Sequence, residues 1–127
     1  MSFALGNKSR VNLNGVHPDL VRVVELAIKK TPVDFTVTEG LRTIERQKQL
    51  VAAGASKTLS SRHITGHAVD LAALLNGKVE WSWPLYSQIA TAMKEAAEEL
   101  KIQIEWGGDW KTFKDGPHFQ LSRSAYP

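Results

Sequence analysis

Apolar and polar residues follow different periods along this chain, and each period predicts an element. Apolar residues recur at helical spacing between Pro18 and Lys30, which predicts a helix over that range. Residues 34–39 alternate between apolar and polar, which is typical of a half-buried strand. Thr43 then suits the cap of a second helix, expected over residues 44–53.

The second half of the chain predicts a hairpin and a long helix. Residues 68–75 are almost continuously apolar, which is typical of a buried strand. The pair Asn76-Gly77 that follows favours a tight turn into a short partner strand. The longest helix is expected over residues 84–100, where Pro84 suits the first turn and apolar residues recur on one face.

Two short strands complete the predicted fold. They are expected over residues 102–106 and 117–121, with a loop between them. The hairpin and the short connections favour an α+β fold, in which a small antiparallel sheet packs with about three main helices. We expect residues 1–127 to form a single domain, because this length builds one core and leaves no room for two.

Composition limits the chemistry and the partners. The chain has no cysteine, so a metal ion would have to bind His, Asp or Glu side chains. Its 16 basic and 13 acidic residues give a net charge of +3 at pH 7, which suits an anionic partner such as a cell-wall polymer. The charges are interspersed, so nucleic-acid binding is not expected. We find no apolar run of membrane-spanning length and no signal peptide, so we expect synthesis in the cytoplasm without membrane insertion.

The segment from Ser61 to Asp70 combines residue types that bind metal. His63 and Asp70 lie on either side of Gly66, and Asp70 interrupts the apolar strand. A carboxylate in a buried strand needs compensation, which a cation shared with His63 would supply. Simpler alternatives stay open, because His63 could be a turn residue and an arginine could pair with Asp70. Asp109 could also replace Asp70 as a ligand, although its Gly-rich loop favours a turn role.

This segment, together with Trp106–Trp110 and Pro117–Phe119, resembles the zinc L-alanyl-D-glutamate peptidases. The likeness runs over nearly the whole chain. These are small enzymes that cut the cell wall, and they include phage endolysins. They are similar in turn to zinc D-alanyl-D-alanine dipeptidases and carboxypeptidases. The resemblance implies zinc as the cofactor and a peptidoglycan stem peptide as the partner.

The resemblance also implies roles for individual residues. Zinc would be held by His63, Asp70 and His118, with Asp115 as the catalytic carboxylate and Arg42 as the helper arginine. Such a ligand set leaves the fourth zinc position for water, whose pKa the metal lowers. A carboxylate can accept the proton of that water, and an arginine can stabilise the developing oxyanion.

Three further expectations concern the surroundings of this site. Ser61 matches the serine of the family motif, and we assign it with Trp110 to substrate binding, although packing is the commoner use of tryptophan. Gly116 is expected to adopt backbone angles that fold the loop back and aim Asp115 at the metal. The alternative role for Asp115 is a turn with the following backbone amides.

Three functions are consistent with these residues. They are a zinc endopeptidase for the L-alanyl-D-glutamate bond, a zinc D-alanyl-D-alanine peptidase, and a non-catalytic zinc-stabilised domain that binds the wall. A free carboxylate at Asp115 argues against the third, whereas the sequence does not separate the first two. We expect a monomer that acts as a phage lysis enzyme and reaches the wall through a separate pore-forming protein.

Overall fold

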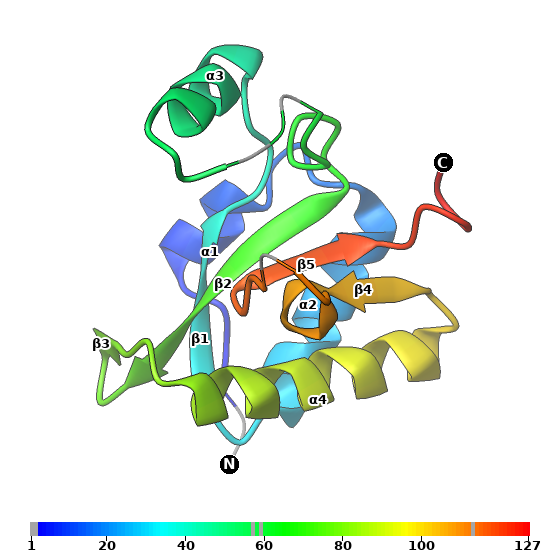
Figure 1. Cartoon of the computed structure of the whole chain (residues 1–127). Coiled ribbons are helices and arrows are strands. Elements are labelled where there is room, and N and C mark those ends of the chain that lie inside the picture. Colours follow the sequence, from blue (N-terminus) through cyan, green and yellow to red (C-terminus); the bar gives the residue numbers. More distant parts are fainter. Residues whose placement is uncertain (1–2, 57, 59, 113) are drawn as a thin grey trace.

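The structure is a computed structural model that describes residues 3–56, 58, 60–112 and 114–127. Within these residues a five-stranded antiparallel sheet lies at the centre, in the order β1-β2-β5-β4, with β3 paired to the C-terminal end of β2 (Figure 1). The strands are β1 (Asp34–Glu39), β2 (Ala68–Leu75), β3 (Lys78–Val79), β4 (Ile104–Trp106) and β5 (His118–Leu121).

Helices surround this sheet. They are α1 (Asn7–Asn12), α2 (Pro18–Lys30), α3 (Ile44–Ala52) and α4 (Trp83–Leu100), with a 3-10 turn, η1 (Gly107–Asp109). Helices α2 and α4 pack against each other, α1 lies along β1, and α3 stands apart at the opposite end of the molecule from α4 (Figure 1). In the part of the chain that the structure describes, no helix is long and apolar enough to cross a membrane.

Alternation along the strands separates an apolar face of the sheet from a polar one. The apolar face of the two central strands is fully buried against α2 and α4 and carries Val69, Leu71, Phe119 and Leu121. Each such side chain contributes about 1.5–3 kcal/mol when it leaves water, so this face fixes the sheet on the helices. Because successive side chains point to opposite faces, Asp70, His118 and Gln120 lie on the polar face.

Helix α2 shows how local sequence sets an element. The Nδ1 atom of His17 accepts a hydrogen bond from the backbone N–H of Asp19 at 3.1 Å, and Pro18 occupies the first turn. His17 therefore belongs to the start of the helix.

The predicted α+β fold is confirmed, with a small antiparallel sheet and three main helices, α2, α3 and α4. Predicted and observed bounds of β1, β2, α3 and α4 agree to within one residue. Strand β4 begins two residues later than predicted. The N–H of Ile102 donates to the carbonyl of Ala97, so Ile102 helps to cap the C-terminus of α4 and does not pair in the sheet. Pro117 lies just outside β5, although its carbonyl accepts from the N–H of Leu71 at 2.9 Å.

Helix α1 was not predicted, because polar contacts hold it in place. Its buried residue is Ser9, whose Oγ accepts from the N–H of Val37 at 2.8 Å and lies 3.1 Å from Oγ1 of Thr36. Asn12 donates to the carbonyl of Val37 at 2.8 Å. A six-residue helix held this way leaves no apolar period in the sequence.

Candidate metal centre and active site

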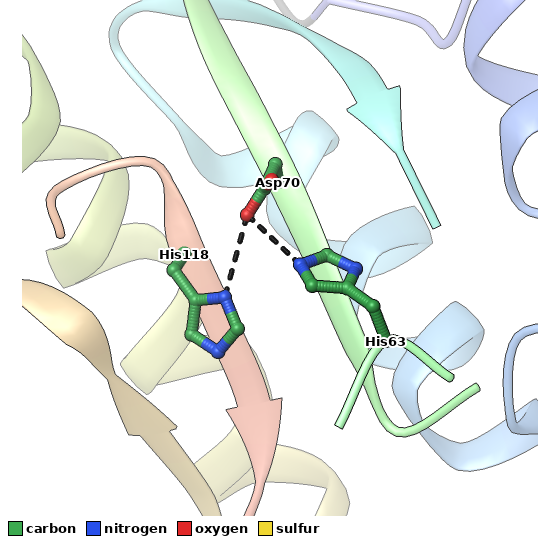
Figure 2. Close-up of side chains that lie close together, drawn as sticks. All are labelled: His63, Asp70 and His118. Atoms are coloured by element: carbon green, nitrogen blue, oxygen red, sulfur yellow. Dashed lines mark hydrogen bonds and ion pairs between the residues drawn. The ribbon is translucent and has the colours of Figure 1, made fainter. Parts of the chain in front are cut away.

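The polar face of the sheet brings three possible metal ligands together. Asp70 on β2 lies directly opposite His118 on β5, and His63 approaches from the loop before β2 (Figure 2). One ligand atom from each residue lies within 4.8 Å of the other two. Both histidines are buried, whereas the Asp70 side chain is 23% exposed. The cluster therefore lies at the border between the interior and solvent.

A backbone contact decides which nitrogen of His63 carries hydrogen. Nδ1 lies 2.8 Å from the carbonyl oxygen of Gly40, which can only accept, so Nδ1–H is the donor. In the neutral ring, the lone pair of Nε2 then points at Oδ1 of Asp70, 3.2 Å away. Two electron-rich atoms at this distance repel each other unless a cation lies between them.

His118 repeats this arrangement from the other side. Its Nε2 lies 2.8 Å from Oε1 of Gln120, which accepts the hydrogen and leaves the Nδ1 lone pair facing the same Oδ1 of Asp70, at 3.4 Å. Metal-binding histidines usually donate their outer N–H to an acceptor in this way. Ligand atoms of a tetrahedral zinc site are about 3.3–3.6 Å apart, given bonds of about 2.0–2.2 Å. The donor set and its spacing therefore fit zinc.

The charges of the cluster depend on one another. Burial alone would raise the pKa of Asp70, but the hydrogen bonds and positive charge that His118 and His63 supply when their rings are protonated outweigh it and hold this pKa well below its usual range. Burial also opposes a charged His118, yet the contact with Asp70 prevails and raises the pKa of His118. Asp70 therefore stays anionic and can neutralise part of the charge of a divalent cation.

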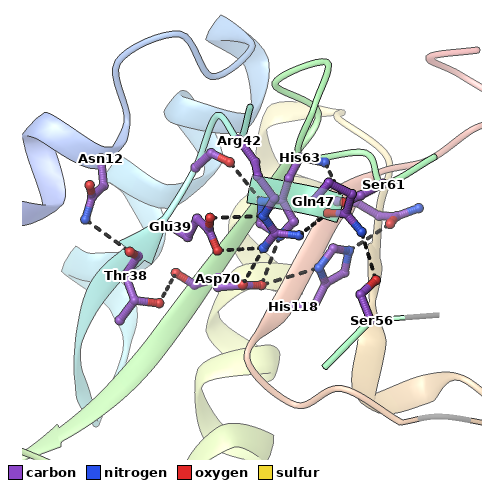
Figure 3. Close-up of polar contacts among 12 residues, drawn as sticks. Asn12, Thr38, Glu39, Arg42, Gln47, Ser56, Ser61, His63, Asp70 and His118 are labelled. Carbon is purple, nitrogen blue, oxygen red and sulfur yellow. Dashed lines mark hydrogen bonds and ion pairs between the residues drawn. The ribbon is translucent and has the colours of Figure 1, made fainter. Parts of the chain in front are cut away.

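Arg42 is buried beside these three residues (Figure 3). Its guanidinium donates to both oxygens of Glu39, at 3.0 and 2.6 Å, and to Oε1 of Gln47 at 2.7 Å. Its Nη2 also lies 3.5 Å from Oδ2 of Asp70. The arginine pairing considered for Asp70 thus exists together with the histidine contacts, because each uses a different carboxylate oxygen.

Asp115 faces the same group from the loop between η1 and β5. Its backbone N–H donates to the carbonyl of Gly107 at 3.0 Å, and its carbonyl accepts from the N–H of His118 at 3.2 Å. Among the described residues the carboxylate itself has no hydrogen-bond partner, so the side-chain turn considered for it is not observed. Burial and the negative charge of Asp70 raise the pKa of Asp115, which makes it a stronger base.

Glycines position this loop through their small size. Gly116 does not have a positive φ, so the predicted fold-back through unusual backbone angles at Gly116 is wrong. A Cβ at Gly116 would instead lie 3.1 Å from the ring of Trp83, and one at Gly107 would collide with the carbonyl oxygen of Asp115. Close packing against these two glycines sets where Asp115 lies.

A cavity of about 540 Å³ joins these groups. Its lining includes the ligand cluster and the two proposed catalytic residues, Arg42 and Asp115, together with Ser61 and Trp110. Ser61 accepts a hydrogen bond from the N–H of His63 at 3.2 Å, and the Trp110 ring lies 5.1 Å from that of His118. Both side chains assigned to substrate binding therefore line the cavity, and their contact with a substrate stays a prediction.

Asp109, the alternative ligand considered above, and His67, which lies between His63 and Asp70 in the sequence, both lie outside the cluster. Asp109 pairs with Nζ of Lys94 at 2.6 Å, and its side chain is 56% exposed at the surface. His67 contacts Oγ1 of Thr65 at 2.7 Å, and its ring lies 5.5 Å from that of His17. Neither residue belongs to the ligand cluster.

Sequence reasoning missed three residues that support the site, namely Glu39, Gln47 and Gln120. Gln120 could have been found, because strand alternation places it on the same face as His118. Glu39 is paired with Asp70 across β1 and β2, so finding it requires the strand register. Gln47 gave no signal, since a polar residue inside a helix normally faces solvent.

Comparison with known proteins identifies the class to which this fold and site belong. The chain belongs to the phage L-alanyl-D-glutamate peptidase family, whose model matches residues 1–122. It is 35% identical to the L-alanyl-D-glutamate peptidase of Escherichia phage T5 over 130 residues, which cover 99% of this chain and 94% of that protein.

Two solved structures extend the comparison. The crystal structure of the L-Ala D-Glu endopeptidase ChiX of Serratia marcescens has a TM-score of 0.91 and 57% identity, covering 95% of this chain and 91% of that one. The vancomycin-resistance D,D-dipeptidase VanXYg has a TM-score of 0.54 and 17% identity, covering 84% and 50%. At that identity, the second likeness concerns the fold alone.

Proposed function

We propose that this chain is a zinc-dependent endopeptidase that hydrolyses the L-alanyl-D-glutamate bond of peptidoglycan stem peptides. One observation carries the proposal: two histidine lone pairs converge on a single oxygen of Asp70, beside Asp115, in a chain of this family. His63, Asp70 and His118 would hold the ion. The printed names of the phage T5 and Serratia relatives support the choice of bond.

The groups that line the cavity would each have a different role in the reaction. Zinc, when bound, would supply Lewis acidity that lowers the pKa of the attacking water and polarises the scissile carbonyl. Asp115 has a carboxylate with a raised pKa, so it can take the proton of the water and pass it to the leaving amine of D-Glu. Arg42, held by Glu39 and Gln47, offers positive charge to the developing oxyanion.

The cavity suits a segment of peptide. Its volume of about 540 Å³ falls within the range of about 300–1,000 Å³ that is usual for small-molecule sites. On this proposal Ser61 and Trp110, which line the cavity, contact the stem peptide, one by its hydroxyl and the other by its ring. The net charge of +3 favours approach to an anionic wall polymer.

We further propose that residues 1–127 act as one catalytic domain and as a monomer, in lysis at the end of a phage infection. The phage family model and the phage T5 relative support this role. On this proposal the enzyme reaches the wall after a separate pore-forming protein has opened the membrane.

Mass spectrometry of digested peptidoglycan tests the choice of bond. We expect zinc-loaded protein to release fragments with a new D-Glu or D-isoglutamine N-terminus, with free D-Ala essentially absent. D-Ala or the D-Ala-D-Ala dipeptide as the main product would indicate a D-alanyl-D-alanine peptidase instead. Intact stem peptides together with tightly bound zinc would indicate a wall-binding domain. Asp115→Asn protein prepared in parallel controls for contaminating enzymes.

A further inference from the structure

Helix α3 is held to the molecule in an unusual way. Gln47 is its fully buried residue, whereas Leu50 and Val51 are only half-buried and Ile44 is 54% exposed. Helices at a protein surface normally bury an apolar stripe against the core. The attachment of α3 therefore depends on what the Gln47 amide contacts.

The Gln47 amide joins two parts of the cavity (Figure 3). Its Oε1 accepts from Nη1 of Arg42 at 2.7 Å, and its Nε2 donates to Oγ of Ser56 at 2.9 Å and to the carbonyl of Thr58 at 2.5 Å. The guanidinium can only donate and the carbonyl can only accept, so these partners fix the amide in one orientation. Both Ser56 and Thr58 line the cavity, on the segment that follows α3.

We propose that Gln47 is a positioning residue that sets the Arg42 guanidinium and, at the same time, the cavity wall at Ser56 and at Thr58. This inference rests on the proposed peptidase function. Through its oxygen Gln47 fixes the charge that faces the oxyanion, and through its nitrogen it fixes the surface that receives the peptide. One side chain thereby links peptide binding to the catalytic arginine.

The two ends of the amide are separable by substitution. In Gln47→Glu, one carboxylate oxygen keeps a charge-assisted bond to Arg42. The other oxygen then faces the carbonyl of Thr58 without a hydrogen, so the contact with Thr58 is lost, whereas the Ser56 hydroxyl can still donate to the carboxylate. Gln47→Leu loses both contacts. Gln49→Leu is the matched control, because Gln49 lies exposed on the same helix.

Steady-state kinetics on a soluble stem peptide, with every variant loaded with zinc, test this inference. Gln47→Leu is expected to lower kcat by about 10- to 100-fold, as loss of a residue that orients a catalytic group does, and to raise KM. Gln47→Glu is expected to keep kcat and to raise KM about two- to tenfold, as loss of one hydrogen bond does. Ser56→Ala should follow Gln47→Glu, and Gln49→Leu should match the wild type.

Other results would overturn the inference. One such result is that Gln47→Leu has the same kcat and KM as Gln49→Leu. Another is that kcat falls equally in Gln47→Glu and in Gln47→Leu. If Gln47→Leu fails to fold by circular dichroism, Gln47→Glu and Ser56→Ala decide, and an unchanged KM in both contradicts the proposal.

A readout without turnover separates this inference from the proposed function. The NMR signal of the Arg42 Nη1–H group, which donates to Gln47, should move and broaden in Gln47→Leu and stay sharp in Gln47→Glu. An unchanged signal in Gln47→Leu refutes the positioning role. A wild type that leaves the L-alanyl-D-glutamate bond intact refutes the function instead.

Discussion

Both histidines that approach Asp70 have their outer nitrogen tied to an acceptor, Gly40 for His63 and Gln120 for His118. This arrangement suits a cation, because the lone pairs that remain on both histidines face one carboxylate oxygen. A proton can occupy that place, as the raised pKa of His118 indicates. Zinc satisfies both lone pairs and the carboxylate at once.

Removal of one ligand tests this arrangement. His118→Ala should lose zinc, because a histidine and a carboxylate alone hold the ion weakly. Elemental analysis after gel filtration should find about one zinc per wild-type chain and essentially none in the variant. His67→Ala is the matched control and should keep its zinc, since His67 lies outside the cluster. One zinc per chain in His118→Ala would show that the ligand assignment is wrong.

The proposed role of Asp115 as the proton acceptor can be tested by substitution. Asp115→Asn should keep the fold and the zinc while losing about a hundredfold or more in turnover, because an amide is a poor proton acceptor. The base must be ionised, so wild-type activity should fall as the pH drops through the raised pKa of Asp115, and the variant should lack this acid limb. Turnover measured against pH checks both points, with Asp109→Asn as the control. Near-normal turnover in Asp115→Asn would leave the base unidentified.

At the scale of elements, the loop before β2 decides where His63 lies. Gly66 in this loop has φ +76°, and its carbonyl accepts from the N–H of His17 at 2.8 Å. A Cβ on Gly66 would lie 2.5 Å from the carbonyl oxygen of Gly15. The loop is thus packed against the start of α2 with no space for a side chain.

Two glycine variants measure what this packing contributes. Gly54 has a similar φ of +77° but nothing within 4 Å of a Cβ. Gly66→Ala and Gly54→Ala should each lose about 1–2 kcal/mol to the backbone conformation. Gly66→Ala should lose at least about 1 kcal/mol more to the collision. Urea denaturation measures the free energy of unfolding of both variants. Equal losses in the two variants would mean that the loop moves to accommodate the added Cβ.

Helices and strands were predictable from the sequence wherever apolar residues recur at the spacing of that element. Strand β1 and helix α2 show such periods, whereas α1, which is fixed by the hydroxyl of Ser9, does not. Pairing of Asp70 with His118 depends on the β2–β5 register, which no local pattern encodes. The family resemblance brought these two residues together without that register. Neither a local pattern nor the family resemblance predicted the role of Gln47, because its partners come from separate segments.

In the molecule as a whole, one face of the sheet serves stability and the other serves chemistry. One face is buried on α2 and α4 and holds the fold together, while the other carries the ligand cluster and the cavity. Residues of the polar face can therefore be substituted without loss of the hydrophobic core. A metal bound on the polar face still adds to stability, because it binds the folded chain and not the unfolded one.

Thermal unfolding measures this coupling. Free zinc at a hundred times its dissociation constant should stabilise the wild type by about 2.7 kcal/mol. For a domain of this size, that corresponds to a rise in Tm of about 10 °C. Differential scanning calorimetry of metal-stripped and zinc-loaded protein gives the value, and His118→Ala should show no rise. An equal rise in His118→Ala would place the zinc elsewhere.

One zinc ion bound by His63, Asp70 and His118 is proposed to make this chain an active L-alanyl-D-glutamate peptidase. The most direct test adds zinc stepwise to metal-stripped protein and counts new D-Glu N-termini from a defined stem peptide. Cleavage should rise linearly, stop rising at one zinc per chain, and be absent at every step in His118→Ala. Cleavage of this bond at full rate by the metal-stripped protein would contradict this proposal.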